Sequence, residues 1–165
     1  MWGGPWPSRQ MALVERSLLD LAVLVERPPR SQPDDVSRSL ARFLVVRTCG
    51  YLEQTVEESC RAFLDSKSSP TSASFGKSWL GRGTSPSPAN LVVLVQRFDH
   101  KWSEELSQLL ADNDEFLHRE VKFLVEKRNS IAHGRSEGIG ARKALDLVSA
   151  ATDVAAWFIL RFDPR

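Results

Sequence analysis

The stretch from Val36 to Phe63, VSRSLARFLVVRTCGYLEQTVEESCRAF, decides the fold of this chain. Its apolar residues recur at steps of three or four, which is the repeat of one face of an α-helix. The residues on this stripe are Val36, Leu40, Phe43, Val45, Cys49, Leu52, Val56, Cys60 and Phe63. An acidic pair directly before the stripe can cap a helix and complement its dipole. The pattern predicts one long helix from about Asp35 to Ser66, with a bend or a close helix crossing at Gly50.

Helical repeats also cover most of the remaining chain. Further helices are predicted over about 10–26, over about 88–111 with a break near His100, over the segment that leads to Arg128, and over about 141–161. A break with a helix cap is expected at Asp112-Asn113-Asp114. Residues 1–9 are expected to be irregular, and the Ser/Gly/Pro-rich stretch 66–89 is expected to be a loop. No strand repeat of period two appears. The sequence therefore predicts an all-α fold, an antiparallel bundle of about five helices forming one domain over 10–165.

Composition places the chain among ordinary globular domains. It has 165 residues, of which 42% are hydrophobic and 26% charged, with a net charge of +1, so any phosphate-binding surface must be local. Cys49 and Cys60 lie about 16 Å apart along the predicted helix, which is too far for a disulfide and typical of buried, reduced thiols. No segment has the apolar length of an export signal or a membrane span. We expect a cytoplasmic protein without a membrane partner.

Chemistry is concentrated in Arg128-Asn129-Ser130-Ile131-Ala132-His133, followed by Gly134. A guanidinium binds phosphate through a planar fork of donors, and an imidazole moves protons near neutral pH. The combination suits cleavage of a phosphodiester. A purely structural interpretation stays open, in which Arg128 forms an internal salt bridge and His133 with Gly134 ends the helix.

Helix geometry separates the two candidate catalytic residues. Arg128 falls on the apolar stripe of its helix, whereas His133 would lie about 140° away around an unbroken helix. One regular helix therefore does not direct both side chains at one phosphate. Either the helix breaks between them, or two copies of the motif meet across a dimer axis.

The motif resembles the Arg-x(4–6)-His signature of HEPN domains, in which a polar residue, often Asn, follows the Arg. Here the spacing is Arg-x4-His, and Asn129 fills the polar position. The long upstream helix with its Tyr51-Leu52-Glu53 stretch is similar to that of the RiboL-PSP-type HEPN subgroup. The resemblance covers roughly residues 36–160, and within that span only the motif is sharply defined.

The resemblance implies a metal-independent endoribonuclease that acts on RNA without a cofactor. His133 would take the proton from a ribose 2′-hydroxyl, and Arg128 would stabilise charge on the phosphorane. Asn129 would position the scissile phosphate or hold His133. The products would be a 2′,3′-cyclic phosphate and a 5′-hydroxyl. The resemblance also implies a homodimer with facing motifs, and a toxin–antitoxin, antiphage or RNA-processing setting in which an inhibitory, antitoxin-like protein partner is expected.

Two residues are candidates for supporting the motif. Glu53 could orient Arg128 or support His133, and Ser130 lies within the motif itself. For Glu53, and for Glu57 one turn later, a solvated helix edge is the alternative interpretation.

The stretch 66–89 is a candidate for RNA affinity. Its cations could hold phosphates, and its tryptophan could stack on bases, although a plain flexible linker is equally consistent. The candidate RNA-binding residues are Lys67, Lys77, Arg82 and Trp79. No metal site is expected, because His100 and His118 match no metal-ligand spacing.

A second function class stays open. A HEPN-like helical module could bind a protein partner or a nucleotide and cut nothing. The two classes differ in where the motif lies: an enzyme needs Arg128 and His133 in an open cleft, whereas a binding module can bury them and pair them elsewhere.

Overall fold

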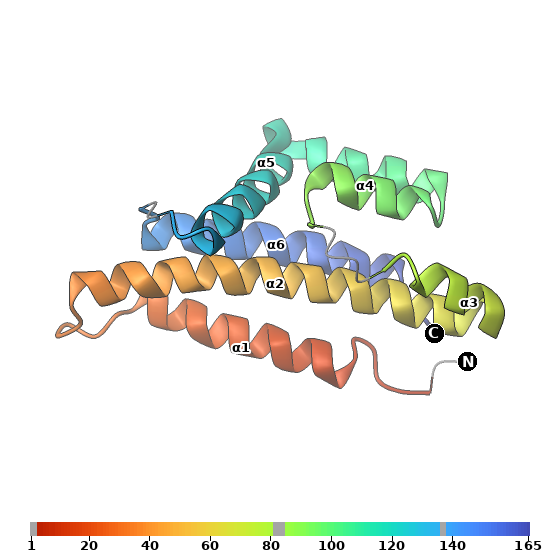
Figure 1. Ribbon diagram of the computed structural model, residues 1–165, viewed down its shortest axis with the longest axis horizontal. Helices are drawn as coiled ribbons and strands as arrows, with labels where there is room; N and C mark the ends of the chain where they lie inside the picture. Colours follow the sequence, from red (N-terminus) through yellow and green to blue (C-terminus); the bar gives the residue numbers. More distant parts are fainter. Residues whose placement is uncertain (1–2, 81–84, 136–137) are drawn as a thin grey trace.

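The computed structural model describes residues 3–80, 85–135 and 138–165 (Figure 1). Within these ranges the regular elements are all helices, so the prediction of an all-α bundle is confirmed. The helices are α1 (Arg9–Glu26), α2 (Asp34–Lys67), α3 (Pro70–Lys77), α4 (Pro88–Gln96), α5 (His100–Ala132) and α6 (Ala141–Arg161).

The long helix α2 is the centre of the bundle and packs against α1, α3, α5 and α6 (Figure 1). Its observed ends lie one residue outside each predicted end, so the long helix is confirmed. The acidic pair forms its first turn without a side-chain cap. The helix runs through Gly50, where a Cβ atom would meet nothing within 4 Å. The expectation of a close helix crossing at Gly50 is therefore wrong.

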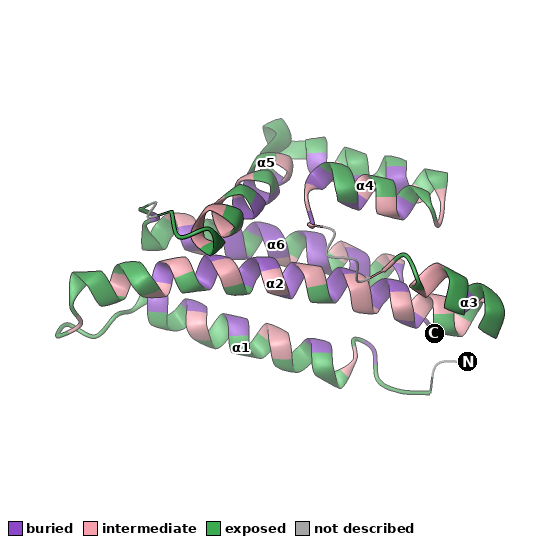
Figure 2. Cartoon of the chain, in the orientation of Figure 1, coloured by how far each residue is buried: buried purple, intermediate pink, exposed green. Residues whose placement is uncertain are grey.

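The core lies where α2, α5 and α6 face one another (Figure 2). Leu52 of α2, Leu124 of α5 and Phe158 of α6 are all 0% exposed. Small residues on α6, such as Ala151 and Ala155, are also 0% exposed, which permits close approach to α2. This packing fixes the second half of α5, which carries the Arg-x4-His motif.

The prediction of a loop over 66–89 is wrong in its first half. The helix α2 continues to Lys67, and α3 then occupies Pro70–Lys77. The Ser69 side chain caps α3 by accepting a hydrogen bond from the backbone N–H of Ser72. Pro70 then fills the first helical position, where its missing N–H costs nothing. The Ser69-Pro70 pair, whose composition is typical of a loop, therefore begins a helix.

The segment 88–111 divides where a break was expected. Helix α4 ends at Gln96, and α5 begins at His100 after Asp99, whose carboxylate accepts from the N–H of Trp102. Helix α5 itself changes direction at Asp112–Glu115, where three consecutive residues have φ of 52°, 54° and 59°. The predicted break at Asp112-Asn113-Asp114 is confirmed, and it turns the motif-bearing half of α5 back over α2.

Candidate functional site

The motif occupies the last turns of α5. Leu117, Val121, Leu124 and Val125 are buried and anchor this half of the helix. The helix then ends in a glycine cap: the N–H of Gly134 donates to Ile131 O at 3.0 Å, and that of Arg135 to Ser130 O at 3.0 Å. Gly134 has a φ of 72°, which glycine adopts without strain. His133 is the cap residue, so the structural role foreseen for His133 and Gly134 is observed.

Arg128 is held from two sides. Its Nη2 atom lies 3.4 Å from Oε1 of Glu53 on α2, and its Nη1 atom donates to Oδ1 of Asn129 at 3.1 Å. The Arg128 side chain is still 37% exposed, and that of Glu53 is 31% exposed. The structure therefore brings together Glu53, Arg128 and Asn129, and leaves the guanidinium open to a ligand.

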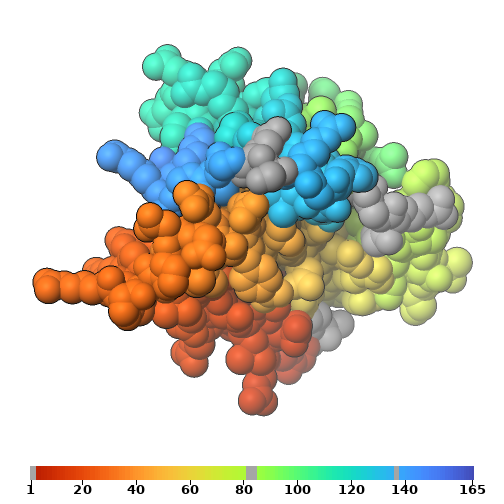
Figure 3. Space-filling view, turned by 60° about the vertical axis from the view of Figure 1, so that its left-hand side comes forward, coloured from red at the N-terminus to blue at the C-terminus, as the bar shows by residue number. Residues whose placement is uncertain are grey.

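His133 does not join this group within one chain. The helix is unbroken from Arg128 to Ala132, so the alternative in which it breaks between the two residues is wrong. The His133 side chain is exposed, and within the described parts of the chain it makes no hydrogen bond or ion pair. Ser130 is half-buried and Asn129 is exposed. The end of α5 lies at the surface of the molecule, where it packs against α2 (Figure 3).

The buried thiol of Cys49 lies beside the ion pair. Its Sγ atom is 3.9 Å from Oε1 of Glu53. Burial and, to a smaller extent, the negative charge of Glu53 together raise the pKa of the Cys49 thiol to about 12, against the opposing effect of Arg128. Burial also raises the pKa of Cys60. Both cysteines are free and buried, as predicted, and neither supplies a thiolate nucleophile at neutral pH.

Two of the predicted RNA-binding cations, Lys67 and Lys77, form contacts away from the motif. Lys67 lies about 21 Å along α2 from Glu53 and donates to the backbone carbonyl of Arg165 at 2.7 Å. Lys77 forms an ion pair with Asp65. Arg82 lies outside the described residues. Among the described members of this set, Trp79 lines the same cavity as Glu53.

That cavity, between α2 and α4, was missed by the sequence analysis. Its volume is about 350 Å³, and its lining includes Glu53 and Val56 from α2 with Leu91 and Leu94 from α4. The remaining lining residues relevant to chemistry are Trp79, Ser85, Asn90 and Arg97. These residues are separated widely in sequence, so no spacing pattern connects them. We refer to this site as the α2–α4 cavity.

The described residues contain no group of three or more His, Cys, Asp or Glu side chains that could hold a metal ion. His100 is exposed and lies 3.5 Å from Glu104, one turn further along α5. None of the helices in the described ranges is long and apolar enough to cross a bilayer.

The fold is an all-helical bundle, and the Arg-x4-His motif lies at the end of its core helix α5. Both features are those expected of a HEPN domain, and a comparison by sequence identifies the family. The sequence model of the RiboL-PSP-HEPN family matches residues 12–156, and the chain belongs to this family. Comparisons with curated proteins and with solved structures gave no significant match. Family membership supports, at the level of the superfamily, a nuclease- or RNA-related role or a helical binding module.

Proposed function

We propose that this protein is a metal-independent endoribonuclease whose active site forms between two copies of the chain. The observation that carries the proposal is the open end of α5, where Arg128 is fixed by Glu53 yet 37% exposed, and where His133 is exposed. A buried and fully paired motif would have favoured a structural role. Here both groups are accessible to a phosphodiester.

The residues suit cleavage by the ribose 2′-hydroxyl. His133 takes the 2′-hydroxyl proton, and the 2′-oxygen forms a bond to phosphorus while the bond to the 5′-oxygen breaks. The leaving 5′-oxygen takes up a proton from water. Arg128 stabilises the negative charge on the phosphorane, and Asn129 positions the phosphate beside it. The products are a 2′,3′-cyclic phosphate and a 5′-hydroxyl.

The geometry of α5 supports a dimeric active site. Because the helix is regular between the two residues, Arg128 and His133 of one chain diverge by about 140°. A two-fold axis near the end of α5 would place His133 of one chain opposite Arg128 of the other. In a toxin–antitoxin, antiphage or RNA-processing setting, an inhibitory partner would act by covering this face.

A second candidate is a module that binds a nucleotide or a protein without cutting. The Glu53–Arg128 ion pair and the glycine cap favour it, because they give both motif ends a structural role. Binding without catalysis would need the guanidinium but not the imidazole. The status of His133 therefore separates the two candidates.

The test is incubation of purified protein with RNA in excess EDTA. Wild type should cleave RNA to 2′,3′-cyclic phosphate ends and leave DNA intact, because DNA lacks the nucleophile. His133→Ala should lose about two or more orders of magnitude in rate. His100→Ala, which removes an exposed histidine from the same helix, is the matched control and should retain activity. Equal cleavage by wild type and His133→Ala would contradict the proposal.

A further inference from the structure

One face of α2 stays at the surface although it carries apolar side chains (Figure 3). Val36 and Phe43 belong to the apolar stripe that predicted this helix, yet they are 41% and 51% exposed. Gly50 follows Phe43 after seven residues, so the three positions lie nearly in one line along the helix. Val46, which is half-buried, lies beside this line. We refer to these four residues as the Gly50 face.

Gly50 leaves a gap in the middle of this face. Within the described residues, no heavy atom outside its own stretch of helix lies within 4 Å of the position that its Cβ atom would occupy. Glycine is unfavourable inside a helix, and no close packing against another helix of the same chain compensates for it here. A gap between larger side chains does, however, allow a helix of another chain to approach to the usual interaxial distance of about 8–10 Å.

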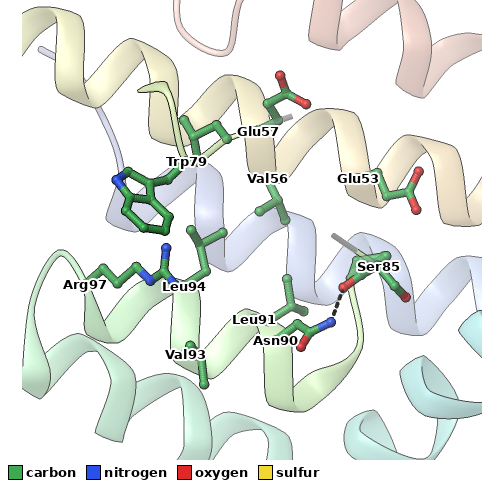
Figure 4. Close-up of a pocket in the computed structure, with 12 residues that line it drawn as sticks. Glu53, Val56, Glu57, Trp79, Ser85, Asn90, Leu91, Val93, Leu94 and Arg97 are labelled. Atoms are coloured by element: carbon green, nitrogen blue, oxygen red, sulfur yellow. Dashed lines mark hydrogen bonds between the residues drawn. The ribbon is translucent and has the colours of Figure 1, made fainter. Parts of the chain in front are cut away.

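The charges along α2 change sign at Gly50. From 36 to 49 the charged residues are all basic, namely Arg38, Arg42 and Arg47. From 51 to 60 they are all acidic, namely Glu53, Glu57 and Glu58. Within the described parts of the chain none of the three arginines is in an ion pair, and the carboxylate of Glu57 points away from the α2–α4 cavity (Figure 4). A face that is basic at one end and acidic at the other is complementary to an antiparallel copy of itself.

We propose that the Gly50 face binds the Gly50 face of a second copy of this chain, with the two α2 helices antiparallel and the two-fold axis at Gly50; this inference rests on the proposed function, whose two-chain site it completes. The apolar side chains of each face are then covered by the other copy. The basic half of each α2 lies against the acidic half of its partner, which fixes the orientation of the pair.

An axis at Gly50 also brings the two motifs together. Glu53 lies three residues from Gly50, which is about 5 Å along the helix. Its Oε1 atom is 3.4 Å from Nη2 of Arg128, so the guanidinium of each copy lies close to the axis. The two Glu53–Arg128 pairs are then within roughly 10 Å of each other along the direction of α2. This is the arrangement that a site with Arg128 from one chain and His133 from the other requires.

The inference is tested by measuring the dimer Kd of Gly50 variants by sedimentation equilibrium. A residue on a two-fold axis faces its own copy, so Gly50→Arg and Gly50→Glu each place like charges opposite each other. Each variant alone should have a Kd at least about tenfold above wild type, and an equimolar mixture of the two should associate at least about tenfold more tightly than either alone. Gly50→Ala adds one methyl group, which this interaxial distance accommodates, so its Kd should stay within about threefold of wild type.

A second position and a control make the result independent of the folding of the charged variants. Phe43→Ala removes an exposed aromatic from the same face and should raise the dimer Kd by about tenfold. Ala156→Arg and Ala156→Glu place the same charges at an exposed position on α6, and they should dimerise as wild type both separately and mixed. Circular dichroism should show equal helix content in all variants.

The outcomes separate this inference from the proposed function. Stronger association of the mixed Gly50 variants without any RNA cleavage by wild type would retain the Gly50 interface and reject the nuclease. RNA cleavage by a dimer whose Kd does not respond to the Gly50 and Phe43 variants would retain the nuclease and overturn this interface. A monomeric wild-type protein, or a mixture that associates no better than its components, would also overturn it.

Discussion

Glu53 and Arg128 form an ion pair with 3.4 Å between Oε1 and Nη2, which joins the middle of α2 to the last turns of α5. Both side chains are about one-third exposed, so the pair adds little to the free energy of unfolding. Its role in the proposed enzyme is to orient the guanidinium. In the proposed enzyme, Glu53 would thus act as a positioning residue for catalysis.

Replacing Glu53 by Gln should lower kcat at saturating RNA by about two- to fivefold, because a solvent-screened ion pair of this kind contributes up to about 1 kcal/mol. Glu57→Gln is the matched control, since Glu57 lies one turn further along α2 and pairs with Arg61. The measurement is kcat together with the melting temperature. A role that is only structural would lower the melting temperature of Glu53→Gln and leave kcat per folded molecule unchanged.

Two glycines should respond to alanine in opposite directions. Gly134 has a φ of 72° at the end of α5, so Gly134→Ala should reduce the free energy of unfolding by about 1 kcal/mol. Gly50 lies inside α2 with open space around its Cβ position, so Gly50→Ala should increase it by about 0.5–1 kcal/mol. Urea unfolding of the two variants checks both values. Shifts of the same sign would contradict these backbone assignments.

Alkaline pH should destabilise the fold through α2. Burial raises the pKa of Cys49 to about 12, with Glu53 adding to the rise, and burial followed by the charge of Glu15 raises the pKa of Tyr51 to about 12. The unfolded chain loses these protons at lower pH than the folded chain, from about 8.5 for the thiols. Above that pH the folded state binds more protons than the unfolded state, so stability falls as pH rises towards 12.

The variant Cys49→Ala with Cys60→Ala tests this alkaline dependence. In this variant the free energy of unfolding should decrease less steeply with pH, by up to about 1.4 kcal/mol per pH unit for each thiol removed. The slope of unfolding free energy between pH 9 and 11 is the measurement, because the cavities left by alanine shift stability at every pH without changing that slope. An unchanged slope would show that the thiols titrate alike in both states.

The sequence carries strong information on the long helices and little on the tertiary arrangement. The apolar stripe of α2 predicts its ends within one residue, and the last helix begins and ends where its pattern predicts. Helix α3 was missed because a helix of 8 residues has too few turns to show a stripe, although the Ser69-Pro70 pair is a start signal.

For the candidate site, too, the sequence predicts the local features but not the tertiary contacts. The motif residues could be identified from their spacing, and their divergence around α5 followed from helix geometry alone. The ion pair between Glu53 and Arg128 and the α2–α4 cavity join segments far apart in the chain. Their assembly depends on the turn at Asp112–Glu115 and on the packing of α4, neither of which local spacing describes.

The central claim is that Arg128 of one chain acts with His133 of another, and a heterodimer of Arg128→Ala with His133→Ala tests it most directly. Two different affinity tags allow its purification. Each homodimeric variant should be inactive, whereas the heterodimer keeps one intact site of two and should recover about half of wild-type activity. The heterodimer of Arg128→Ala/His133→Ala with wild type is the control, since it holds one Arg128 and one His133 on the same chain and should be inactive. An inactive Arg128→Ala with His133→Ala heterodimer, or a strictly monomeric active protein, would contradict the account.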